Sequence, residues 1–363
     1  MSVDRVTVRV ELAGHGYPVH IGAGLLSDDP LLTGHLPPGR LMVVSNETVA
    51  PLYLGRVLET LAHRDPQALV LPDGERYKTL DTASAILDRL ADSGFHRDGA
   101  ILALGGGVVG DLAGFAAACY MRGIDYLQLP TTLLAQVDAS VGGKTGVNHP
   151  RGKNLIGAFH QPRAVVADTN TLATLPEREY RAGLAEVVKY ALIDDAPFLG
   201  WLEARTEPLT QRDAAVLVPT IERCCRNKAA IVGADEREKD QRALLNLGHT
   251  FAHALETATG YERFLHGEAV AIGLVLATRL SVEREGLAPA LADRVETLLH
   301  RLGLETGLPG DLSPDRLLDT MRLDKKATES GMRLVLVSSQ GRAVLRDDVP
   351  EASVLGVLAD ASG

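Results

Sequence analysis

Histidine and glutamate residues in the second half of the sequence have the types and spacing of a metal site. His249 and His253 are four residues apart, which places both imidazoles on one face of a helix. His266 follows, and Glu186 sits in the otherwise apolar stretch 183–189, where a carboxylate is costly to bury unless it is paired or bound to metal. Such ligands suit a tetrahedral zinc-type site with an open position. Spacing alone leaves open which three of the four are ligands, and two exposed or core histidines are the alternative.

A glycine-rich turn in the first half could bind a phosphorylated nucleotide. Gly105, Gly107 and Gly110 follow the apolar run 101–104 and fit the pattern G-x-G-x-x-G. Glycines let backbone amides approach a pyrophosphate at a helix N-terminus, where the helix dipole favours negative charge. An ordinary tight turn is the alternative, because several strand–helix units precede this one and a dinucleotide fingerprint is usually in the first. The upstream polar turn 73–78 could hold ribose or adenine, or could be a solvated loop.

Basic residues recur inside these motif-like segments and could bind an anion. They are Lys144, Lys153, Lys189, Lys228, Arg242, Lys325 and Lys326. In a chain with a net charge of −10, cations placed beside Gly, Asn and Thr indicate a phosphate or carboxylate site. Each lysine taken singly could be a solvated surface residue. Lys189, three positions after Glu186, could also form a plain ion pair within one helix.

The composition is that of an acidic globular protein with two domains. A chain of 363 residues is long for one core, and 45% apolar with 23% charged residues is ordinary for a globular protein. The net charge of −10 argues against nucleic acid and anionic membrane as partners. The three cysteines show no disulfide or zinc spacing, and we find neither a signal peptide nor an apolar stretch of bilayer length. We therefore expect a cytoplasmic protein.

Strands and helices alternate in the first half of the chain. Alternating apolar and polar residues predict an edge strand at 6–11, and short apolar runs predict strands at 41–44, 68–71, 101–104, 126–129 and 164–167. Helix-length segments lie at 49–63, 80–93 and 111–122. This order predicts a mainly parallel α/β sheet.

The pattern becomes helical after residue 174. Thr174 is a candidate N-cap, with Pro176 in the first turn and Glu177 three residues after the cap. Only 332–345, around Gly341, has the pattern of a hairpin. We therefore expect an α/β protein with a Rossmann-like, mainly parallel α/β domain over residues 1–175 and a mostly α-helical domain over residues 176–363.

Taken together, these motifs resemble the 3-dehydroquinate synthase family of the sugar-phosphate cyclase superfamily. The matching segments are 73–78, 105–115, 120–123, 129–138, 140–144, 152–154, 183–189, 245–250, 266–269 and 324–326. The resemblance implies an NAD-dependent and zinc- or cobalt-dependent lyase that converts 3-deoxy-D-arabino-heptulosonate 7-phosphate to 3-dehydroquinate and phosphate. It implies that C5 is oxidised transiently, phosphate is eliminated, the ketone is reduced again, and ring opening with aldol closure follows. A homodimer is usual in the family.

The resemblance also implies roles for individual residues. It gives Glu186, His249 and His266 as metal ligands and leaves His253 for proton transfer or hydrogen bonding. It places Lys144, Lys153, Asn154 and Arg122 around the phosphate, Lys228, Arg242 and Asn246 at the carboxylate and hydroxyls, Lys189 and Asp138 near the reacting carbon, and Lys325 or Lys326 at the same substrate. The implied NAD contacts are Asp73, Glu75, Lys78, Gly107, Val108, Val109, Gly110, Asp111, Thr131, Thr132, Lys144, Lys153, Thr171, Leu172 and Thr174.

Three other functions are alternatives. A sister cyclase, such as an aminodehydroquinate, 2-deoxy-scyllo-inosose or 2-epi-valiolone synthase, would share the NAD and metal motifs. Lys228, Arg242 and Asn246 favour a carboxylate-bearing substrate, which leaves the aminodehydroquinate type open. A metal-dependent polyol dehydrogenase would share the glycine turn and the histidine pair but would need no phosphate cradle. A non-catalytic nucleotide-binding scaffold is the third alternative. In every enzymatic case the expected partner is a small molecule, with no nucleic acid and no membrane.

Overall fold

The computed structural model describes residues 5–238, 241–323, 327–328 and 331–361. The chain divides into two compact units, one formed by Met1–Leu175 with Leu217–Arg237 and the other by Pro176–Val216 with Glu238–Gly363. The sequence-based division assigned residues 217–237 to the second domain, whereas in the structure they belong to the first unit.

Contacts of the long helix α8 (Ala214–Ala234) explain why the chain returns to the first unit. The Cys225 thiol donates to the Gln136 carbonyl at 3.3 Å, and Lys228 forms an ion pair with Asp138. At Gly233 an added Cβ would lie 2.8 Å from the backbone oxygen of Glu11, so the helix backbone approaches β1 closely there. The first two contacts join residues about 90 positions apart, and the third joins residues 222 positions apart. Sequence patterns do not reveal such contacts.

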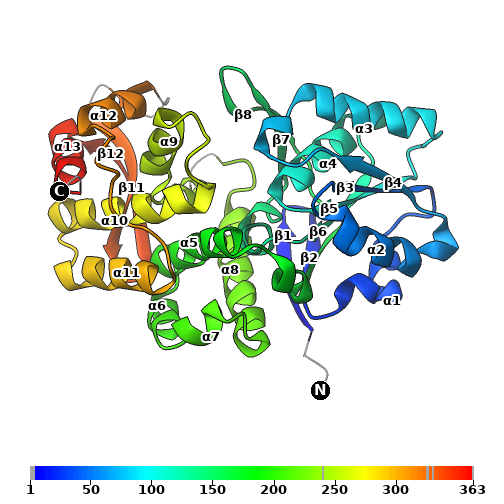
Figure 1. The fold of residues 1–363 in the computed structure, drawn as a ribbon, viewed down its shortest axis with the longest axis horizontal. Coiled ribbons are helices and arrows are strands. Elements are labelled where there is room, and N and C mark those ends of the chain that lie inside the picture. Colours follow the sequence, from blue (N-terminus) through cyan, green and yellow to red (C-terminus); the bar gives the residue numbers. More distant parts are fainter. Residues whose placement is uncertain (1–4, 239–240, 324–326, 329–330, 362–363) are drawn as a thin grey trace. The chain divides into compact units, whose positions relative to one another are not determined.

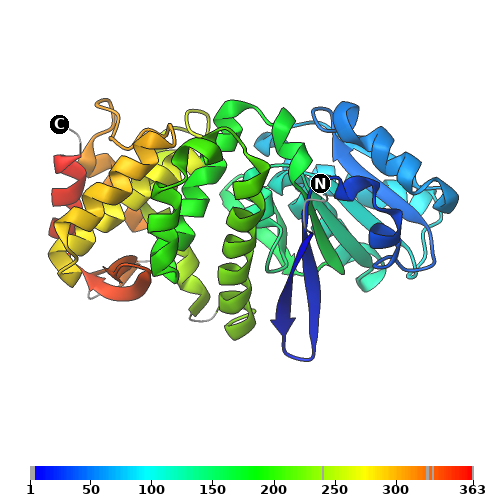
Figure 2. The ribbon, with the colours of Figure 1, turned by 90° about the horizontal axis from the view of Figure 1, so that it is seen from below.

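The first unit is built on a seven-stranded sheet with the order β1-β2-β9-β6-β5-β3-β4. Its strands are β1 Val6–Leu12, β2 His15–Gly22, β3 Leu41–Asn46, β4 Gln67–Leu71, β5 Ala100–Gly105, β6 Asp125–Pro130 and β9 Ala164–Asp168. Only the edge pair β1–β2 is antiparallel, and it forms a long hairpin (Figure 2). All six predicted strands lie in this sheet, so the mainly parallel α/β fold is confirmed.

Helices cover both faces of the central strands (Figure 1). Along β3, Leu41 and Val43 belong to one buried cluster while Met42 and Val44 belong to the other. This alternation with a buried residue at every position is expected of a parallel strand that is covered on both sides. The covering helices are η1 Leu25–Ser27, α1 Asp29–Thr33, η2 Ala50–Leu54 and α2 Gly55–Thr60 on one face, and α3 Leu80–Asp92 and α4 Gly107–Cys119 on the other.

Two helix predictions in this unit need correction. The segment 49–63 is helical but not one regular α-helix: the π-helical turn η2 continues directly into α2, and the 3-10 turn η3 (Ala62–Arg64) follows Leu61. The predicted helix 111–122 begins earlier, at Gly107, and ends at Cys119, so the glycine turn forms its first turn. The other short elements are η4 Glu75–Tyr77, η5 Tyr120–Arg122, η6 Ala135–Ala139, η7 Thr169–Thr174 and the antiparallel pair β7 Lys144–His149 and β8 Gly152–Phe159.

The second unit is mostly helical, with a three-stranded antiparallel sheet. Its elements are α5 Glu177–Ile193, α6 Ala196–Glu203, α7 Thr206–Thr210, η8 Gln241–Asn246, α9 His249–Ala258, α10 His266–Glu285, α11 Pro289–Arg301, α12 Pro314–Leu323, β10 Ala327–Thr328, β11 Gly331–Ser339, β12 Arg342–Val349 and α13 Glu351–Asp360. The hairpin around Gly341 is β11–β12, as predicted.

The predicted cap of α5 is wrong. Pro176, not Thr174, is the residue before the first helical turn, and no side chain caps it. Thr174 instead ends η7, where its hydroxyl donates to the Thr171 carbonyl at 3.2 Å. Local hydrogen bonding of a threonine in the preceding turn therefore competes with the cap.

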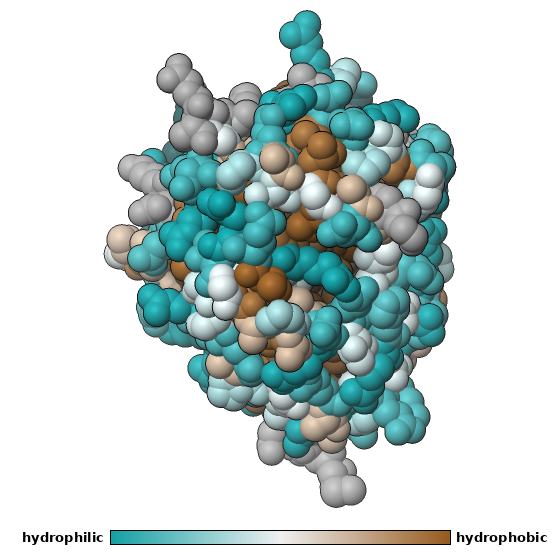
Figure 3. All heavy atoms as spheres, turned by 90° about the vertical axis from the view of Figure 1, so that its left-hand side faces the viewer, coloured by the Kyte–Doolittle hydropathy of each residue, from teal (hydrophilic) through white to brown (hydrophobic). Residues whose placement is uncertain are grey.

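The described helices do not include one with the length and apolar character needed to cross a bilayer. The face of the molecule in Figure 3 is mostly hydrophilic, with small apolar patches among polar residues.

Candidate active site

Helices α5, α9 and α10 of the second unit meet through close backbone contacts. A Cβ added at Gly267 of α10 would lie 1.9 Å from the Ala182 oxygen of α5. A Cβ added at Gly273 would lie 2.2 Å from the oxygen of Gly248, which precedes α9 with φ +78°. The two glycines let α10 lie directly against the α5 backbone and against the start of α9 (Figure 1).

This packing brings three ligand-type side chains together from three helices. Glu186 of α5, His249 of α9 and His266 of α10 each offer one ligand atom, and the three atoms lie within 4.8 Å of one another. The Nε2 atoms of His249 and His266 lie 3.5 Å and 3.4 Å from Glu186 Oε1. Ligands about 2.0–2.1 Å from a tetrahedral zinc ion are about 3.4 Å apart. The cluster therefore has the donors and spacing of a three-ligand metal site.

The second polar atom of His249 and of Glu186 is bound by a neighbouring group. His249 Nδ1 donates to the Leu247 carbonyl at 3.1 Å, which leaves Nε2 to face Glu186. Lys189 Nζ lies 2.5 Å from Glu186 Oε2, and both side chains are almost fully buried. The plain ion pair considered from the sequence is thus present, but it uses Oε2, whereas the two imidazoles lie nearest Oε1.

Burial and charge set the protonation of the two imidazoles. Burial lowers the pKa of His249 to about 3, although Glu186 opposes the shift. Burial also lowers the pKa of His266, but its interactions with Glu186 and Glu256 have a larger, opposite effect and raise the pKa to about 9. At neutral pH His249 is therefore neutral and His266 is an imidazolium between two carboxylates. A bound cation would replace that proton.

Other predicted substrate residues of this unit lie near the cluster in sequence and differ in burial. His253 is half-buried, and its ring centroid is 5.8 Å from that of His249 and 6.4 Å from that of His266. Arg242 is 1% exposed and Asn246 is half-buried, both in η8. Lys325 and Lys326 lie outside the described residues.

The glycine turn of the first unit forms a helix N-terminus directly after a central strand. β5 ends at Gly105 and α4 begins at Gly107, without a side-chain cap in the described structure. At Gly110 an added Cβ would lie 2.8 Å from Gln128 Oε1, so this glycine allows close helix–strand packing. The Thr131 amide donates to the Gly105 carbonyl at 2.9 Å. The first amides of α4 have no partner within the helix and can bind an anion there.

A buried cation links three predicted site residues beside this turn. Lys78 is 5% exposed, and its Nζ donates to Asn154 Oδ1 at 2.6 Å and to Asp111 Oδ2. Asn154 has φ +55°, a conformation that asparagine tolerates better than most residues. Burial raises the pKa of Asp111, and Lys78 opposes this shift. The strand-end turn 73–78 is thereby tied to α4 and β8.

The remaining predicted cofactor contacts differ in what they can offer. Val109 and Leu172 have core side chains, so only their backbone can reach a ligand, and Val108 is half-buried. Five of the other side chains are polar and already hydrogen-bonded within the unit: Asp73 accepts from Asn46 and Thr48, Glu75 accepts from Asn148, Thr132 accepts from the Ala135 amide, Thr171 donates to the Asp168 carbonyl and Thr174 bonds Tyr53.

The predicted substrate cations of the first unit lie on four different elements. Lys228 Nζ donates to the Asp138 carbonyl at 2.8 Å and to its carboxylate. Lys144 is exposed at the start of β7 and Lys153 is half-buried in β8. Arg122 is exposed, with φ +67°, beyond the C-terminal end of α4. It is separated from the glycine turn by the helix length of about 18 Å.

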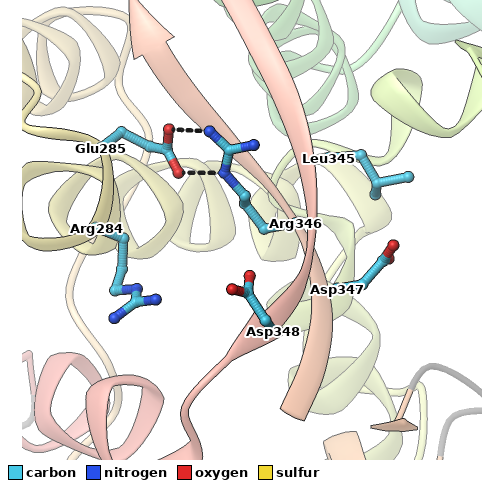
Figure 4. Close-up of a pocket in the computed structure, with 6 residues that line it drawn as sticks. All are labelled: Arg284, Glu285, Leu345, Arg346, Asp347 and Asp348. Carbon is cyan, nitrogen blue, oxygen red and sulfur yellow. Dashed lines mark hydrogen bonds and ion pairs between the residues drawn. The ribbon is translucent and has the colours of Figure 1, made fainter. Parts of the chain in front are cut away.

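A surface pocket of about 490 Å³ lies apart from the ligand cluster. Figure 4 shows Glu285 at the end of α10 making a bidentate ion pair with Arg346 of β12, on the same side of the strand as Asp348, while Asp347 lies on the other side with Leu345. Glu285 lies 19 residues after His266 on one helix, which corresponds to about 28 Å. This pocket therefore does not belong to the candidate site.

Sequence reasoning missed two kinds of residue. Asn46 and Asn148, which hold the carboxylates of the 73–78 turn, carry no motif of their own. Glu256, whose Oε1 lies 3.6 Å from His266 Nδ1, was detectable because it falls on the His249–His253 face at the next helical turn.

Comparison with known proteins places these features in a family. Residues 68–182 match the model of the 3-dehydroquinate synthase N-terminal region, and residues 183–327 match that of its C-terminal region. A 3-dehydroquinate synthase of Methylococcus capsulatus is 57% identical over 93% of this chain and 94% of its own length.

Two solved structures have the same fold at lower identity. One is 2-deoxy-scyllo-inosose synthase complexed with carbaglucose-6-phosphate, NAD+ and Co2+, at 27% identity and a TM-score of 0.89 over 98% of this chain and 100% of the other. The other is 2-epi-5-epi-valiolone synthase from Streptomyces hygroscopicus with NAD+ and Zn2+ bound, at 30% identity and 0.88 over 99% of each chain. The match over nearly the full length and the much higher identity to the dehydroquinate enzymes lead to one conclusion: the chain belongs to the 3-dehydroquinate synthase family.

Proposed function

We propose that the protein converts 3-deoxy-D-arabino-heptulosonate 7-phosphate to 3-dehydroquinate and phosphate, as a lyase with no net redox change. The observation that carries this proposal is the convergence of Glu186, His249 and His266 in a chain of this family. The helix N-terminus at Gly107 supports a nucleotide function for the first unit.

Metal binding belongs to the second unit in this proposal. Glu186 Oε1 and the Nε2 atoms of His249 and His266 would hold zinc or cobalt, since both metals accept carboxylate and imidazole ligands. A metal there supplies Lewis acidity that favours loss of a substrate hydroxyl proton. Lys189 pairs with the second oxygen of Glu186, Oε2. His253, whose ring lies near both ligand imidazoles, would accept or return a proton.

Nucleotide binding belongs to the first unit. The α4 amides at 107–109 would hold the NAD pyrophosphate, with Gly110, the 73–78 turn, Asp111, Thr131, Thr132 and the turn 171–174 around it. Bound NAD supplies the reversible hydride acceptance that transient oxidation at C5 requires.

Basic side chains bind and orient the anionic groups of the substrate. Lys144, Lys153, Asn154 and Arg122 would hold the phosphate, and Lys228, Arg242 and Asn246 the carboxylate and hydroxyls, with Asp138 close by and Lys325 or Lys326 contributing from outside the described residues. Lys228 lies against Asp138 in the protein, so its cation would be shared between that carboxylate and the substrate. We further propose a cytoplasmic homodimer, the usual state of this family.

The test is phosphate release from the heptulosonate phosphate with NAD and zinc, followed together with absorbance at the NADH band. We expect phosphate release that a chelator abolishes, without net NADH. Growth of NADH with simple polyols and no phosphate release would contradict the proposal and support a dehydrogenase. Turnover of only the amino analogue or of sedoheptulose 7-phosphate would instead assign the chain to a sister cyclase activity. Sedimentation of the purified protein tests the dimer.

A further inference from the structure

A buried carboxylate outside the three-ligand cluster faces one of its imidazoles. Glu256 of α9 is 2% exposed, and a carboxylate buried to this degree is costly unless it is paired. Its Oε1 lies 3.6 Å from His266 Nδ1, the ring nitrogen on the far side from Glu186. The position of Glu256 therefore matches a role in holding that ring.

The two imidazoles of the cluster have different partners at Nδ1. His249 Nδ1 donates to a backbone carbonyl, that of Leu247. His266 Nδ1 faces the carboxylate of Glu256. Either partner places the proton on Nδ1 and leaves the Nε2 lone pair for a ligand, but a carboxylate also makes the imidazole a stronger donor.

Charge near the cluster gives Glu256 a second effect. The Lys189 ammonium lies against Glu186 and offsets its negative charge. Without another anion, a dication would meet two neutral imidazoles and a neutralised carboxylate. Glu256 supplies that anion from the next helical turn of α9.

We propose that Glu256 is a positioning residue of the metal site, which fixes the orientation and tautomer of His266 through Nδ1 and strengthens its Nε2 as a ligand. The inference rests on the metal site of the proposed function. It adds a residue to which the motifs assign no role.

Two substitutions separate hydrogen bonding from charge. Glu256→Gln keeps an oxygen that can accept from Nδ1 but removes the charge, and Glu256→Leu removes both at similar size. Glu283→Gln is the control, because Glu283 is exposed on the same helix, α10, and accepts a hydrogen bond from the Ser353 hydroxyl. Far-UV circular dichroism and urea unfolding of the metal-free proteins establish that each variant is folded.

The measurement is zinc affinity by competition with a chromogenic chelator, together with the visible spectrum of the cobalt-loaded protein. Loss of a hydrogen-bond partner of a metal-bound histidine weakens metal binding about 10- to 100-fold. We therefore expect zinc affinity to fall about 10-fold in Glu256→Gln and about 100-fold in Glu256→Leu, and to stay unchanged in Glu283→Gln. The cobalt bands should shift in both Glu256 variants.

Three results would overturn the proposal. One is wild-type zinc affinity and an unchanged cobalt spectrum in Glu256→Gln, which decides the matter even if the Leu variant does not fold. Another is lost turnover with unchanged metal binding, which would give Glu256 a different role. A wild-type protein that does not bind zinc would remove the metal site itself, and with it both this inference and the metal part of the proposed function.

Discussion

Gly267→Ala tests whether close helix packing builds the metal cluster. The new Cβ would lie 1.9 Å from the Ala182 oxygen and 2.5 Å from its carbonyl carbon, both backbone atoms that cannot rotate away. Ordinary contact begins at 3.4 Å, so α10 must move from α5 by about 1.5 Å, a shift much larger than the ~0.5 Å within which ligands must be held. His266 adjoins Gly267, and its Nε2 now lies 3.4 Å from Glu186 Oε1.

Two losses follow from this displacement. Overpacking of a buried helix contact costs about 1–3 kcal/mol, so the free energy of unfolding of the metal-free protein should fall by about 3 kcal/mol in urea titrations. A ligand misplaced by about 1 Å costs on the order of 100-fold in function, and we expect zinc affinity to fall at least that much.

Gly356→Ala is the matched control for this prediction. Gly356 is exposed in α13, and a Cβ there meets nothing within 4 Å. Alanine should raise the free energy of unfolding by about 0.5–1 kcal/mol through helix propensity and leave zinc affinity unchanged. If Gly267→Ala behaves like this control in both measurements, the argument that a glycine contact positions His266 is refuted.

Two further predictions concern the first unit. Lys78→Met leaves the Asp111 carboxylate without its cation. Because that carboxylate is partly exposed, we expect the free energy of unfolding in urea to fall by about 2 kcal/mol. We also expect weaker NAD binding, measured by calorimetry. His20 has its pKa lowered to about 4, mainly by burial and then by His35 and Arg5, with Asp28 opposing. Because the pKa of His20 is lower in the folded protein than in the unfolded chain, the contribution of neutral His20 to the free energy of unfolding is fully present above about pH 6.5 and is lost as the pH falls toward 4. We expect this loss to be about 2 kcal/mol after allowance for solvent screening.

Control variants and contradicting outcomes can be stated for both the Lys78 and the His20 prediction. Arg76→Met, an exposed cation on the same turn, should leave stability unchanged, and equal stability of Lys78→Met would show that Asp111 does not depend on Lys78. For the pH effect, His20→Gln should flatten the stability profile between pH 6.5 and 4, whereas His63→Gln, at an exposed position, should not. Identical profiles for wild type and His20→Gln would contradict the assignment to His20.

Local patterns were sufficient for most of the sheet and for part of the site. Apolar runs identified β3, β5, β6 and β9 because strands buried on both faces are continuous apolar segments. β2 was not predicted, since its polar residues interrupt the run. The pair His249 and His253 could be assigned to one helical face, but spacing alone did not decide between His253 and His266 as a member of the ligand cluster.

The sequence by itself determined the class of fold, the family and the kinds of ligand atom that the chain can offer. Tertiary structure decided which atoms converge: Glu186 comes from a helix 63 residues before His249, and the contact of Gly267 with Ala182 brings His266 to it. Tertiary structure also returned residues 217–237 to the first unit and turned one oxygen of Glu186 toward Lys189. The physical reason is the same in each case. Periodicity reports the burial of neighbouring residues along one element, whereas helix approach and ion pairing depend on backbones that are distant in sequence.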